Sequence, residues 1–245
     1  MKAMVLAAGL GTRLRPLTDN RPKALVEVAG HTLLEITLAR LRAFDVHEVI
    51  VNVHHFADMV VEYLKAHRNF GMQIEISRED ILLDTGGGLK KVAWFFASDE
   101  PFILHNVDVI STVDLRRMLE SHVKNKALAT LAVQDRSTSR YLLFDEDGRL
   151  CGRRIVKEDK TEIVRTSRRM DALAFSGIHV ISPRLCSMMT EEGAFSIVGS
   201  YLNLAGRGEN IMAFRSDEYY WRDLGKPENV KVAADDVAHG TIQLF

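Results

Sequence analysis

The first 23 residues constrain the fold more than any other part of the chain. Ala3–Ala8 is a short apolar run of the kind found in a buried parallel strand, and it ends in a turn that carries Gly9 and Gly11. Three arginines and a lysine follow within a dozen residues. Glycines let backbone N–H groups approach phosphate oxygens closely, and the cations supply the opposite charge. The segment therefore predicts a polyphosphate site; the alternative is an ordinary strand–loop junction with solvated arginines.

Two better-known glycine loops are excluded. A P-loop requires Gly-Lys followed by Ser or Thr, whereas Gly225-Lys226 is followed by Pro227. A dinucleotide-binding loop requires a third glycine, where this chain has Leu14. It also requires an acidic residue at the end of the second strand, where the chain reads Asn52-Val53-His54. The sequence therefore argues against a dinucleotide-dependent oxidoreductase.

The run LAAGLGTRLRPLT, with Pro22-Lys23 after it, resembles the signature of the sugar-1-phosphate nucleotidyltransferase family. Members of that family join a nucleoside triphosphate to a sugar phosphate. The resemblance implies that this loop wraps the triphosphate, that Arg13 contacts the phosphates and that Lys23 assists phosphoryl transfer. The residues that it places against the nucleotide in this segment are Leu6, Ala7, Ala8, Gly9, Gly11, Thr12 and Arg13.

Composition favours a soluble, cytosolic protein of one large or two small domains over a binder of nucleic acid or membranes. The 245 residues carry a net charge of −1, which gives no reason to expect either kind of partner. No apolar run approaches the ~18 residues of a membrane span, and charge after Gly9 argues against a signal peptide. Cys151 and Cys186 lie far apart without metal-binding spacing, as expected of free buried thiols in a reducing compartment.

Strand and helix patterns alternate through the first half, and this rhythm predicts a parallel sheet covered on both faces. The expected strands are Ala3–Ala8, Glu48–Val53, Met72–Ser77 and Pro101–Asn106. The expected helices are Thr32–Phe44, Ala57–His67, Gly86–Ala97 and Leu115–Lys124. Within the third helix, Trp94-Phe95-Phe96 is interpreted as core. Ligands of such sheets bind beyond the carboxyl ends of the strands, which is where the glycine loop falls.

After Ala127 the pattern becomes rich in strands, with few helices between them. The expected strands are 127–133, 140–145, 149–156, 162–166 and 172–181, with a hairpin turn at 145–148 and helices at 195–205 and 229–237. The fold class is thus α/β, a Rossmann-like, mostly parallel sheet flanked by helices, with a β-rich insertion or lid over the sugar site. We expect one nucleotidyltransferase domain over 1–245, with a nucleotide-binding half (1–126), a β-rich sugar-binding half that includes the C-terminal helices (127–245) and no acyltransferase domain.

Two carboxylates are candidates for a metal site. Asp108 follows an apolar strand in the sequence Asn106-Val107-Asp108, and a carboxylate at a strand's carboxyl end can hold Mg²⁺ against a triphosphate; the alternative is a helix cap or turn aspartate. The family usually shows Asn-Gly-Asp here, with the aspartate as a magnesium ligand. The segment from Trp221 to Glu228 resembles a second family motif and implies that Asp223 is the other ligand. Val107 and Lys226 depart from these motifs.

The remaining motifs concern the base and the sugar. Three successive glycines after Thr85 are costly to order, so a close backbone approach is expected. The resemblance assigns this loop to the base and ribose and adds Asn106 to the nucleotide site. The base-loop residues are Thr85, Gly87 and Gly88, and the candidate sugar-binding residues are Ser176, Gly177 and Lys157. Adjacent side chains of an extended segment point apart, so His54-His55 does not predict a metal site.

The resemblance implies Mg²⁺-dependent transfer of a nucleotidyl group from an NTP to a sugar 1-phosphate, giving an NDP-sugar and pyrophosphate. The expected catalytic residues are Arg13, Lys23, Asp108 and Asp223, the last two as metal ligands. The short chain and the LDTGGG loop favour UTP with an amino-sugar phosphate. The alternatives are a guanylyltransferase that uses GTP and a mannose or heptose phosphate, and a non-catalytic nucleotide-sugar-binding regulator. The sequence leaves the oligomeric state open.

Overall fold

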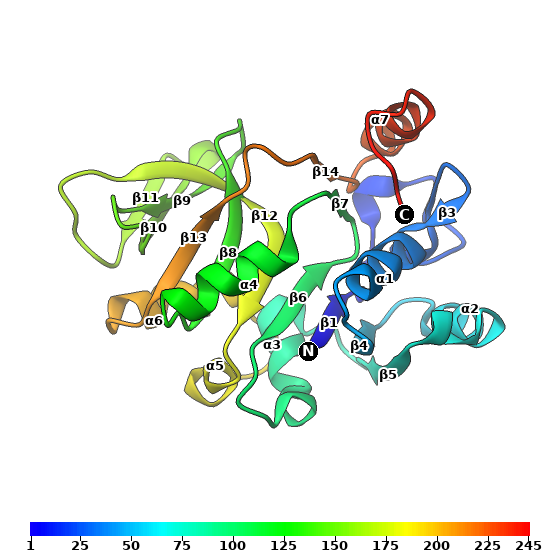
Figure 1. The fold of residues 1–245 in the computed structure, drawn as a ribbon, viewed down its shortest axis with the longest axis horizontal. Coiled ribbons are helices and arrows are strands. Elements are labelled where there is room, and N and C mark those ends of the chain that lie inside the picture. The colour runs from blue at the N-terminus through cyan, green and yellow to red at the C-terminus, as the bar shows by residue number, and fades with distance from the viewer.

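A ten-stranded sheet forms the centre of the computed structural model, which describes residues 1–245 (Figure 1). Eight strands follow the order β11-β10-β9-β12-β6-β1-β4-β5; β8 pairs with β12, and β13 pairs with β8. The strands are β1 (Lys2–Leu6), β4 (Glu48–Val53), β5 (Gln73–Arg78), β6 (Phe102–Asn106), β8 (Ala129–Gln134), β9 (Arg140–Phe144), β10 (Leu150–Ile155), β11 (Lys160–Ile163), β12 (Asp171–Ile181) and β13 (Ile211–Arg215). Two short pairs stand apart from this sheet, β2 (Glu27–Val28) with β3 (His31–Thr32) and β7 (Val109–Ser111) with β14 (Trp221–Asp223).

The parallel part of the sheet comprises β6, β1, β4 and β5. β1 pairs in parallel with both β4 and β6, and the register sets Leu6 opposite Asn52 on one side and Asn106 on the other. Three carboxyl ends therefore meet at one edge, which is where a ligand of an open α/β sheet binds. The α/β prediction with a mostly parallel central sheet is confirmed.

The β-rich second half extends this same sheet. β12 runs antiparallel to β6, with Ile178 opposite His105, and it also pairs with β8 and β9. A register shift between Phe175 and His179 marks a bulge in the pairing of β12 with β8. Because β12 is eleven residues long and β6 only five, the N-terminal part of β12 projects past the carboxyl end of β6. The strands of the second half therefore rise beside the edge where β1 and β6 end.

Alternating side chains divide the core into two clusters, one on each face of the sheet. Ala3 and Val5 of β1 belong to the cluster that also contains Leu34 and Leu38, whereas Met4 belongs to the cluster around Tyr201. The first cluster includes residues of α1 (Leu33–Ala43), α2 (Ala57–Ala66), α4 (Leu115–Lys124) and α7 (Pro227–Ala238). The second includes residues of α3 (Asp84–Lys91), α5 (Arg184–Met188) and α6 (Ile197–Gly206). Figure 1 shows α1 and α4 crossing in front of the sheet.

Local capping explains where the helices begin. Thr32 accepts a hydrogen bond from the backbone of Glu35 at 3.1 Å and starts α1, while Asp114 accepts two at the start of α4. The predicted helix over Gly86–Ala97 is wrong in extent, because α3 ends at Lys91 and a separate 3₁₀ turn spans Ala93–Phe96. The turn directs Trp94 outward, and that side chain is 64% exposed. The interpretation of Trp94 as core is therefore wrong.

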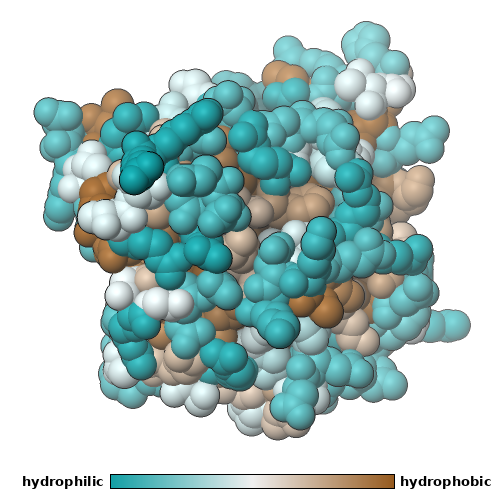
Figure 2. Space-filling view, turned by 60° about the vertical axis from the view of Figure 1, so that its left-hand side comes forward, coloured by the Kyte–Doolittle hydropathy of each residue, from teal (hydrophilic) through white to brown (hydrophobic).

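The surface carries no long apolar segment. None of the helices combines the length and the hydrophobicity that crossing a bilayer would demand. On the face shown in Figure 2, hydrophilic residues cover most of the surface and hydrophobic ones form only small groups. Both cysteines are free thiols, with Cys151 buried and Cys186 half-buried.

Candidate active site

A cavity of about 400 Å³ opens at the edge where β1, β4 and β6 end. It is lined by backbone and side chains from the glycine loop, from the ends of β4 and β6 and from the start of α3. The lining residues are Leu6, Ala8, Gly9, Lys23, Asn52, Glu79, Leu82, Asp84, Thr85, Asn106, Val107, Asp108 and Ala194. The structure thus brings to one cavity candidate residues that are up to 102 positions apart in the chain, from Leu6 to Asp108.

The glycine loop is held from both ends. The backbone N–H of Ala7 donates to Asn52 Oδ1 at 2.7 Å, which ties the end of β1 to the end of β4. Farther along, the Thr18 hydroxyl donates to the carbonyl of Gly11 at 2.8 Å, and Gly11 has a φ of 65°, a conformation that favours glycine. Gly11, Thr12 and Arg13 do not line the cavity, and the Arg13 side chain extends from an exposed turn beside it.

Lys23 and Asp108 form an ion pair on the cavity wall. The side chains are 15% and 11% exposed, so both charges are largely removed from solvent. Lys23 begins a 3₁₀ turn after Pro22, and Asp108 follows the end of β6. In this low-dielectric setting each charge needs the other, because an unpaired buried charge is strongly destabilising.

Asp223 reaches the same edge through the short ladder between β7 and β14. Asp223 lies opposite Val109, and the N–H of Leu224 donates to the carbonyl of Asp108 at 2.8 Å. The two aspartates are therefore brought side by side in the backbone, although 114 residues separate them in the chain. Asp223 Oδ1 accepts from the N–H of Gly225 at 2.7 Å.

Arg13 and Asp223 both approach Gly225. A Cβ at Gly225 would lie 2.7 Å from Arg13 Nη2 and 2.8 Å from Asp223 Oδ1. Only a glycine leaves room for these two groups at this position. The side chains of Arg13 and Asp223 thus meet at Gly225, next to the Lys23–Asp108 pair.

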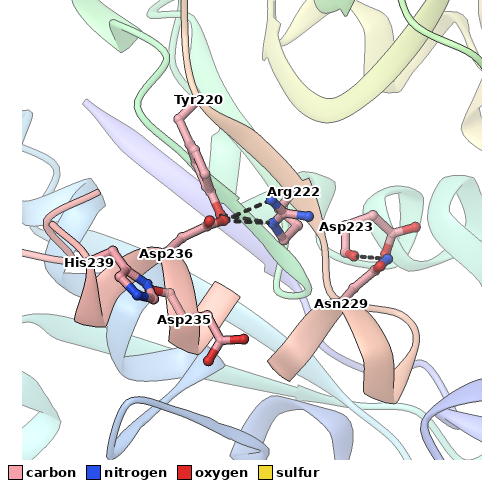
Figure 3. Close-up of polar contacts among 7 residues, drawn as sticks. All are labelled: Tyr220, Arg222, Asp223, Asn229, Asp235, Asp236 and His239. Carbon is pink, nitrogen blue, oxygen red and sulfur yellow. Dashed lines mark hydrogen bonds and ion pairs between the residues drawn. The ribbon is translucent and has the colours of Figure 1, made fainter. Parts of the chain in front are cut away.

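The C-terminal helix fixes β14 in place (Figure 3). Asn229 Nδ2 on α7 donates to the carbonyl of Asp223 at 2.7 Å. One residue earlier, Arg222 turns away to Asp236 on α7 and pairs with it at 2.7 Å, and the Tyr220 hydroxyl donates to the same carboxylate at 2.6 Å. This arrangement holds the backbone of Asp223 while leaving its carboxylate to the site.

The two departures from the family motifs fit the structure without strain. Val107 has no positive φ, and its side chain is buried in the core cluster that contains Val5. The backbone here therefore does not require the glycine that the family usually carries. Lys226 is exposed at the start of α7, ahead of Pro227 in the first turn.

The glycines of α3 serve close packing inside the protein. A Cβ at Gly87 would lie 2.3 Å from the carbonyl of Gly193, and one at Gly88 would lie 2.9 Å from Glu79 Oε1. Gly87 and Gly88 are both buried and do not line the cavity, whereas Thr85 does line it. Thr85 Oγ1 also accepts from the N–H of Ile197 at 3.0 Å, which links α3 to the start of α6.

Asn52 and Glu79 are cavity residues that the sequence did not identify. The Asn52 amide donates to Glu79 Oε1 at 2.7 Å, and Glu79 Oε2 accepts from the N–H of Leu83 at 2.9 Å. Both side chains are buried, with Glu79 only 4% exposed. The sequence could have indicated Asn52, because it is a polar residue inside the apolar strand 48–53. No feature of the sequence indicated Glu79. His54 Nδ1 lies 2.8 Å from the carbonyl of Glu79, and no cluster of three metal-ligating residues occurs anywhere in the chain.

Two of the sugar-site candidates, Ser176 and Gly177, lie on β12 beside β6, whereas Lys157 follows β10, two strands away from β12. Gly177 has a φ of 74°, and a Cβ there would lie 2.8 Å from Asn106 Nδ2, so Gly177 packs directly on the end of β6. The neighbouring Ser176 is fully buried. Lys157 is exposed in a 3₁₀ turn after β10, and β9 separates that strand from β12. Neither Ser176, Gly177 nor Lys157 lines the cavity.

His105 lies directly behind the site on β6. Burial lowers the pKa of this imidazole to about 4. Its Nδ1 lies 2.8 Å from the carbonyl of Asn106, and its Nε2 is buried without a hydrogen-bond partner. A neutral imidazole here stabilises the end of β6 and does not face the cavity.

Solved structures share this fold. HddC from Yersinia pseudotuberculosis, solved in a complex with GMP-PN, has a TM-score of 0.76 at 21% identity, and the match covers 96% of this chain and 99% of that one. A putative glucose-1-phosphate thymidylyltransferase from Bacillus anthracis has a TM-score of 0.78 at 20% identity, with 96% and 94% covered.

Sequence relatives give the family. The chain is 35% identical over 242 residues to the N-acetylmuramate alpha-1-phosphate uridylyltransferase of Caulobacter vibrioides, with 95% of each chain covered. It is 31% identical over 233 residues to a mannose-1-phosphate guanyltransferase of Yarrowia lipolytica, of which it spans 62%. A family model described as nucleotidyl transferase matches residues 2–160. The chain therefore belongs to the nucleotidyl transferase family and is an enzyme, a nucleotidyltransferase.

Proposed function

We propose that this enzyme transfers a nucleotidyl group from an NTP to a sugar 1-phosphate and releases pyrophosphate. One observation carries the proposal: Lys23 and Asp108 pair on the wall of the cavity beneath the glycine loop, and the β7–β14 ladder sets Asp223 beside them. The proposal is supported by the position of this cation and these two carboxylates at the edge where such sheets bind ligands.

The nucleotide occupies the cavity in this proposal. Leu6, Ala8 and Gly9 border it, and Thr85 and Asn106 supply polar groups to its lining. The triphosphate then extends toward Lys23 and toward Arg13, with the remainder of the loop, including Ala7, Gly11 and Thr12, around it. Gly87 and Gly88 act from behind by letting α3 pack closely enough to form the wall.

The carboxylates suit a magnesium ion. Mg²⁺ prefers oxygen ligands and is usually bound by one or two carboxylates together with substrate phosphates. Asp108 and Asp223 provide such a pair next to the phosphate loop, since Asp223 lies opposite Val109 and the N–H of Leu224 donates to the carbonyl of Asp108. When bound there, the ion would offset charge that develops on the departing pyrophosphate.

The chain itself needs to supply little covalent chemistry. A sugar phosphate is mostly dianionic at neutral pH, because the second pKa of a phosphate monoester is about 6. The acceptor is therefore already a nucleophile and requires no general base. The barrier lies in bringing two polyanions into line, and the fixed positive charges of Lys23 and Arg13 lower it by offsetting their repulsion.

The choice of substrates rests on the names of the relatives. The Caulobacter relative, matched over 95% of both chains, carries a name that specifies uridylyl transfer to N-acetylmuramate 1-phosphate. We therefore place UTP and an amino-sugar phosphate first, and GTP with a mannose or heptose phosphate second. The second choice rests on relatives such as the Yarrowia guanyltransferase.

Pyrophosphate release tests the proposal. Each of the four NTPs is mixed with Mg²⁺ and one sugar 1-phosphate at a time, and pyrophosphate is measured with a coupled assay. Release that requires enzyme, NTP and sugar phosphate together is the expected result. Nucleotide binding without release from any pair would instead identify a non-catalytic nucleotide-sugar-binding protein.

A further inference from the structure

Arg136 is a half-buried cation that the site described above does not use. It lies just beyond the end of β8, and its guanidinium carbon stands 3.6 Å from the centre of the Trp221 ring. Its Nη2 donates to the carbonyl of Phe175 at 2.8 Å. The side chain makes no ion pair, and its Nε is buried without a hydrogen-bond partner. Buried donors are almost always paired in folded proteins, so an unpaired one on a charged group requires an explanation.

Arg136 lies close to Asp223, the carboxylate proposed as a metal ligand. Trp221 and Asp223 are two residues apart on β14, so their side chains point to the same face of that strand. A cation stacked on Trp221 therefore lies beside Asp223. Burial lowers the pKa of the Arg136 guanidinium, and Asp223 followed by Tyr141 opposes that effect. The guanidinium remains charged under all ordinary conditions.

Trp221 also connects this cation to the wall of the site. The indole N–H donates to the carbonyl of Ser176 at 2.7 Å, and the next residue, Gly177, packs on Asn106 at the cavity. Arg136 is thus fixed between the projecting part of β12 and the strand that carries Asp223. A flat guanidinium whose face rests on an aromatic ring can still donate from its edge, and since Nη2 is engaged with Phe175 and Nε is buried, Nη1 is the donor left for a phosphate or carboxylate.

Other cations are less suited to this role. Lys157, the candidate from sequence for a sugar-phosphate contact, is exposed and lies two strands away from β12. Lys23 is already engaged with Asp108, and Arg13 lies on the glycine-loop side of Asp223. Arg136 is the positive charge on the side of Asp223 that faces the β-rich half.

We infer that Arg136 binds an anionic group of the acceptor and sets its affinity and orientation. The inference rests on the proposed function, since it assumes that the acceptor enters from the β-rich side. The anionic group is either the 1-phosphate that all acceptors share or a carboxylate carried by an acidic sugar such as N-acetylmuramate. Both present the same pair of oxygens to the guanidinium edge.

Steady-state kinetics of Arg136→Gln tests the inference. Loss of this charge-assisted contact is expected to raise the KM for the acceptor about 10- to 100-fold, while the KM for the NTP stays within about twofold. Arg136→Lys is expected to recover only part of the loss, because an ammonium cannot make the planar contact. Arg140→Gln removes an exposed arginine on the neighbouring β9 and serves as the matched control. An unchanged acceptor KM, or an equal rise in both KM values, would overturn the inference.

Two acceptors separate the sources of the anion. With N-acetylglucosamine 1-phosphate and N-acetylmuramate 1-phosphate in parallel, a rise in KM for both identifies the phosphate as the group bound. A rise for the muramate compound alone identifies the carboxylate. Either pattern supports the role of Arg136 and assigns its ligand.

A binding measurement distinguishes failure of this inference from failure of the proposed function. The chain has two tryptophans, so Trp94→Phe leaves Trp221 as the sole reporter. Titration with the sugar phosphate in the absence of NTP is expected to change Trp221 fluorescence, and Arg136→Gln is expected to weaken this response at least tenfold. If the enzyme releases no pyrophosphate from any pair, the titration decides alone: Arg136-dependent binding upholds the inference, and no binding or Arg136-independent binding refutes it.

Discussion

Asp108 and Lys23 form an ion pair in which each charge is held by its partner and shielded from water by the cavity wall. Neither side chain could be buried at this depth alone, because the desolvation of a lone charge costs several kcal/mol. The pairing also fixes the position of the Asp108 carboxylate on the cavity wall. Residue-level predictions for the site therefore begin with this carboxylate.

Asp108→Asn keeps the shape of the side chain and removes its charge. We expect kcat to fall about 10²- to 10³-fold, the range seen when one preorganised electrostatic contact is lost. Because the variant leaves Lys23 without a charged partner, we expect the unfolding free energy to fall by about 3–5 kcal/mol, with the circular dichroism of the remaining folded protein like that of the parent. Asp19→Asn, at an exposed aspartate paired with Arg15, provides the control and should leave kcat unchanged. A near-normal kcat in Asp108→Asn would remove Asp108 from the catalytic machinery.

Gly177→Ala tests the close packing of β12 on the end of β6. The variant places a Cβ 2.8 Å from Asn106 Nδ2 at a residue whose φ is 74°, so it adds both backbone strain and a clash. We expect a loss of roughly 2–4 kcal/mol in unfolding free energy together with a lower kcat. Gly148→Ala has a similar φ of 78° with its nearest neighbour 3.9 Å away, and should show the backbone cost alone, roughly 1 kcal/mol. Equal losses in the two variants would show that Asn106 is not displaced.

At the scale of elements, a buried amide joins β1, β4 and α3. Asn52 accepts from Ala7 and donates to Glu79, and Glu79 in turn accepts from Leu83 ahead of α3. The network thus sets the distance between the glycine loop and the wall that carries Thr85. The geometry of this network therefore depends on β1, β4 and α3 together.

Asn52→Ala breaks this network at its centre. The N–H of Ala7 and the carboxylate of Glu79 would each lose a partner, so we expect a loss of about 1–3 kcal/mol in unfolding free energy. Because the loop and α3 would no longer be held together, the KM for the NTP should rise. Asn125→Ala, which removes an exposed amide bonded to Ser121, is the matched control and should change neither quantity. Chemical denaturation and initial-rate kinetics measure both effects.

Elements with a strong local pattern were predictable from sequence. The apolar periodicity of 32–44 anticipated α1, and the apolar run of 48–53 matches β4. The strands β7 and β14 were missed because each has only three residues and forms through pairing with the other across more than a hundred positions. The end of α3 at Lys91 was missed because no proline or glycine marks it.

The site was predictable where a motif was long and local, as in the segment from Leu6 to Lys23. The adjacency of Asp108 and Asp223 is a tertiary consequence of the β7–β14 ladder, and the resemblance to a known family supplied that expectation. No sequence pattern identifies Glu79 or Arg136, because their importance comes from the residues that surround them in the folded protein. Burial and an unpaired donor become visible only in three dimensions.

At the scale of the whole molecule, buried histidines make stability depend on pH, and His122 and His179 add to the effect of His105. Burial lowers the pKa of His122 to about 4 and that of His179 to about 3, whereas an exposed imidazole titrates near 6.5. As the pH falls below about 6.5, the unfolded chain takes up protons that the folded chain refuses. The free energy of unfolding contributed by these residues is therefore fully present above that pH and is lost as the pH falls toward 4.

We expect the unfolding free energy to drop by about 2 kcal/mol per histidine between pH 7.5 and pH 5, a sizeable part of the 5–15 kcal/mol typical of a domain. Urea denaturation at the two pH values measures this change. His179→Gln can keep the contact to Tyr201 without titrating, and its unfolding free energy should fall by about 2 kcal/mol less than that of the parent over the same interval. The same pH dependence in both proteins would mean that His179 is not the source.

The central claim is that the cavity at the ends of β1, β4 and β6 transfers the nucleotidyl group, not a terminal phosphate. Reaction with NTP labelled with ³²P at the α-phosphate, in parallel with label at the γ-phosphate, tests this most directly. We expect α-label to appear in the sugar nucleotide and γ-label to leave as pyrophosphate, with both products formed about 10²- to 10³-fold more slowly by Asp108→Asn. Transfer of γ-label to the sugar, or nucleotide binding with no transfer of α-label to any acceptor, would contradict it.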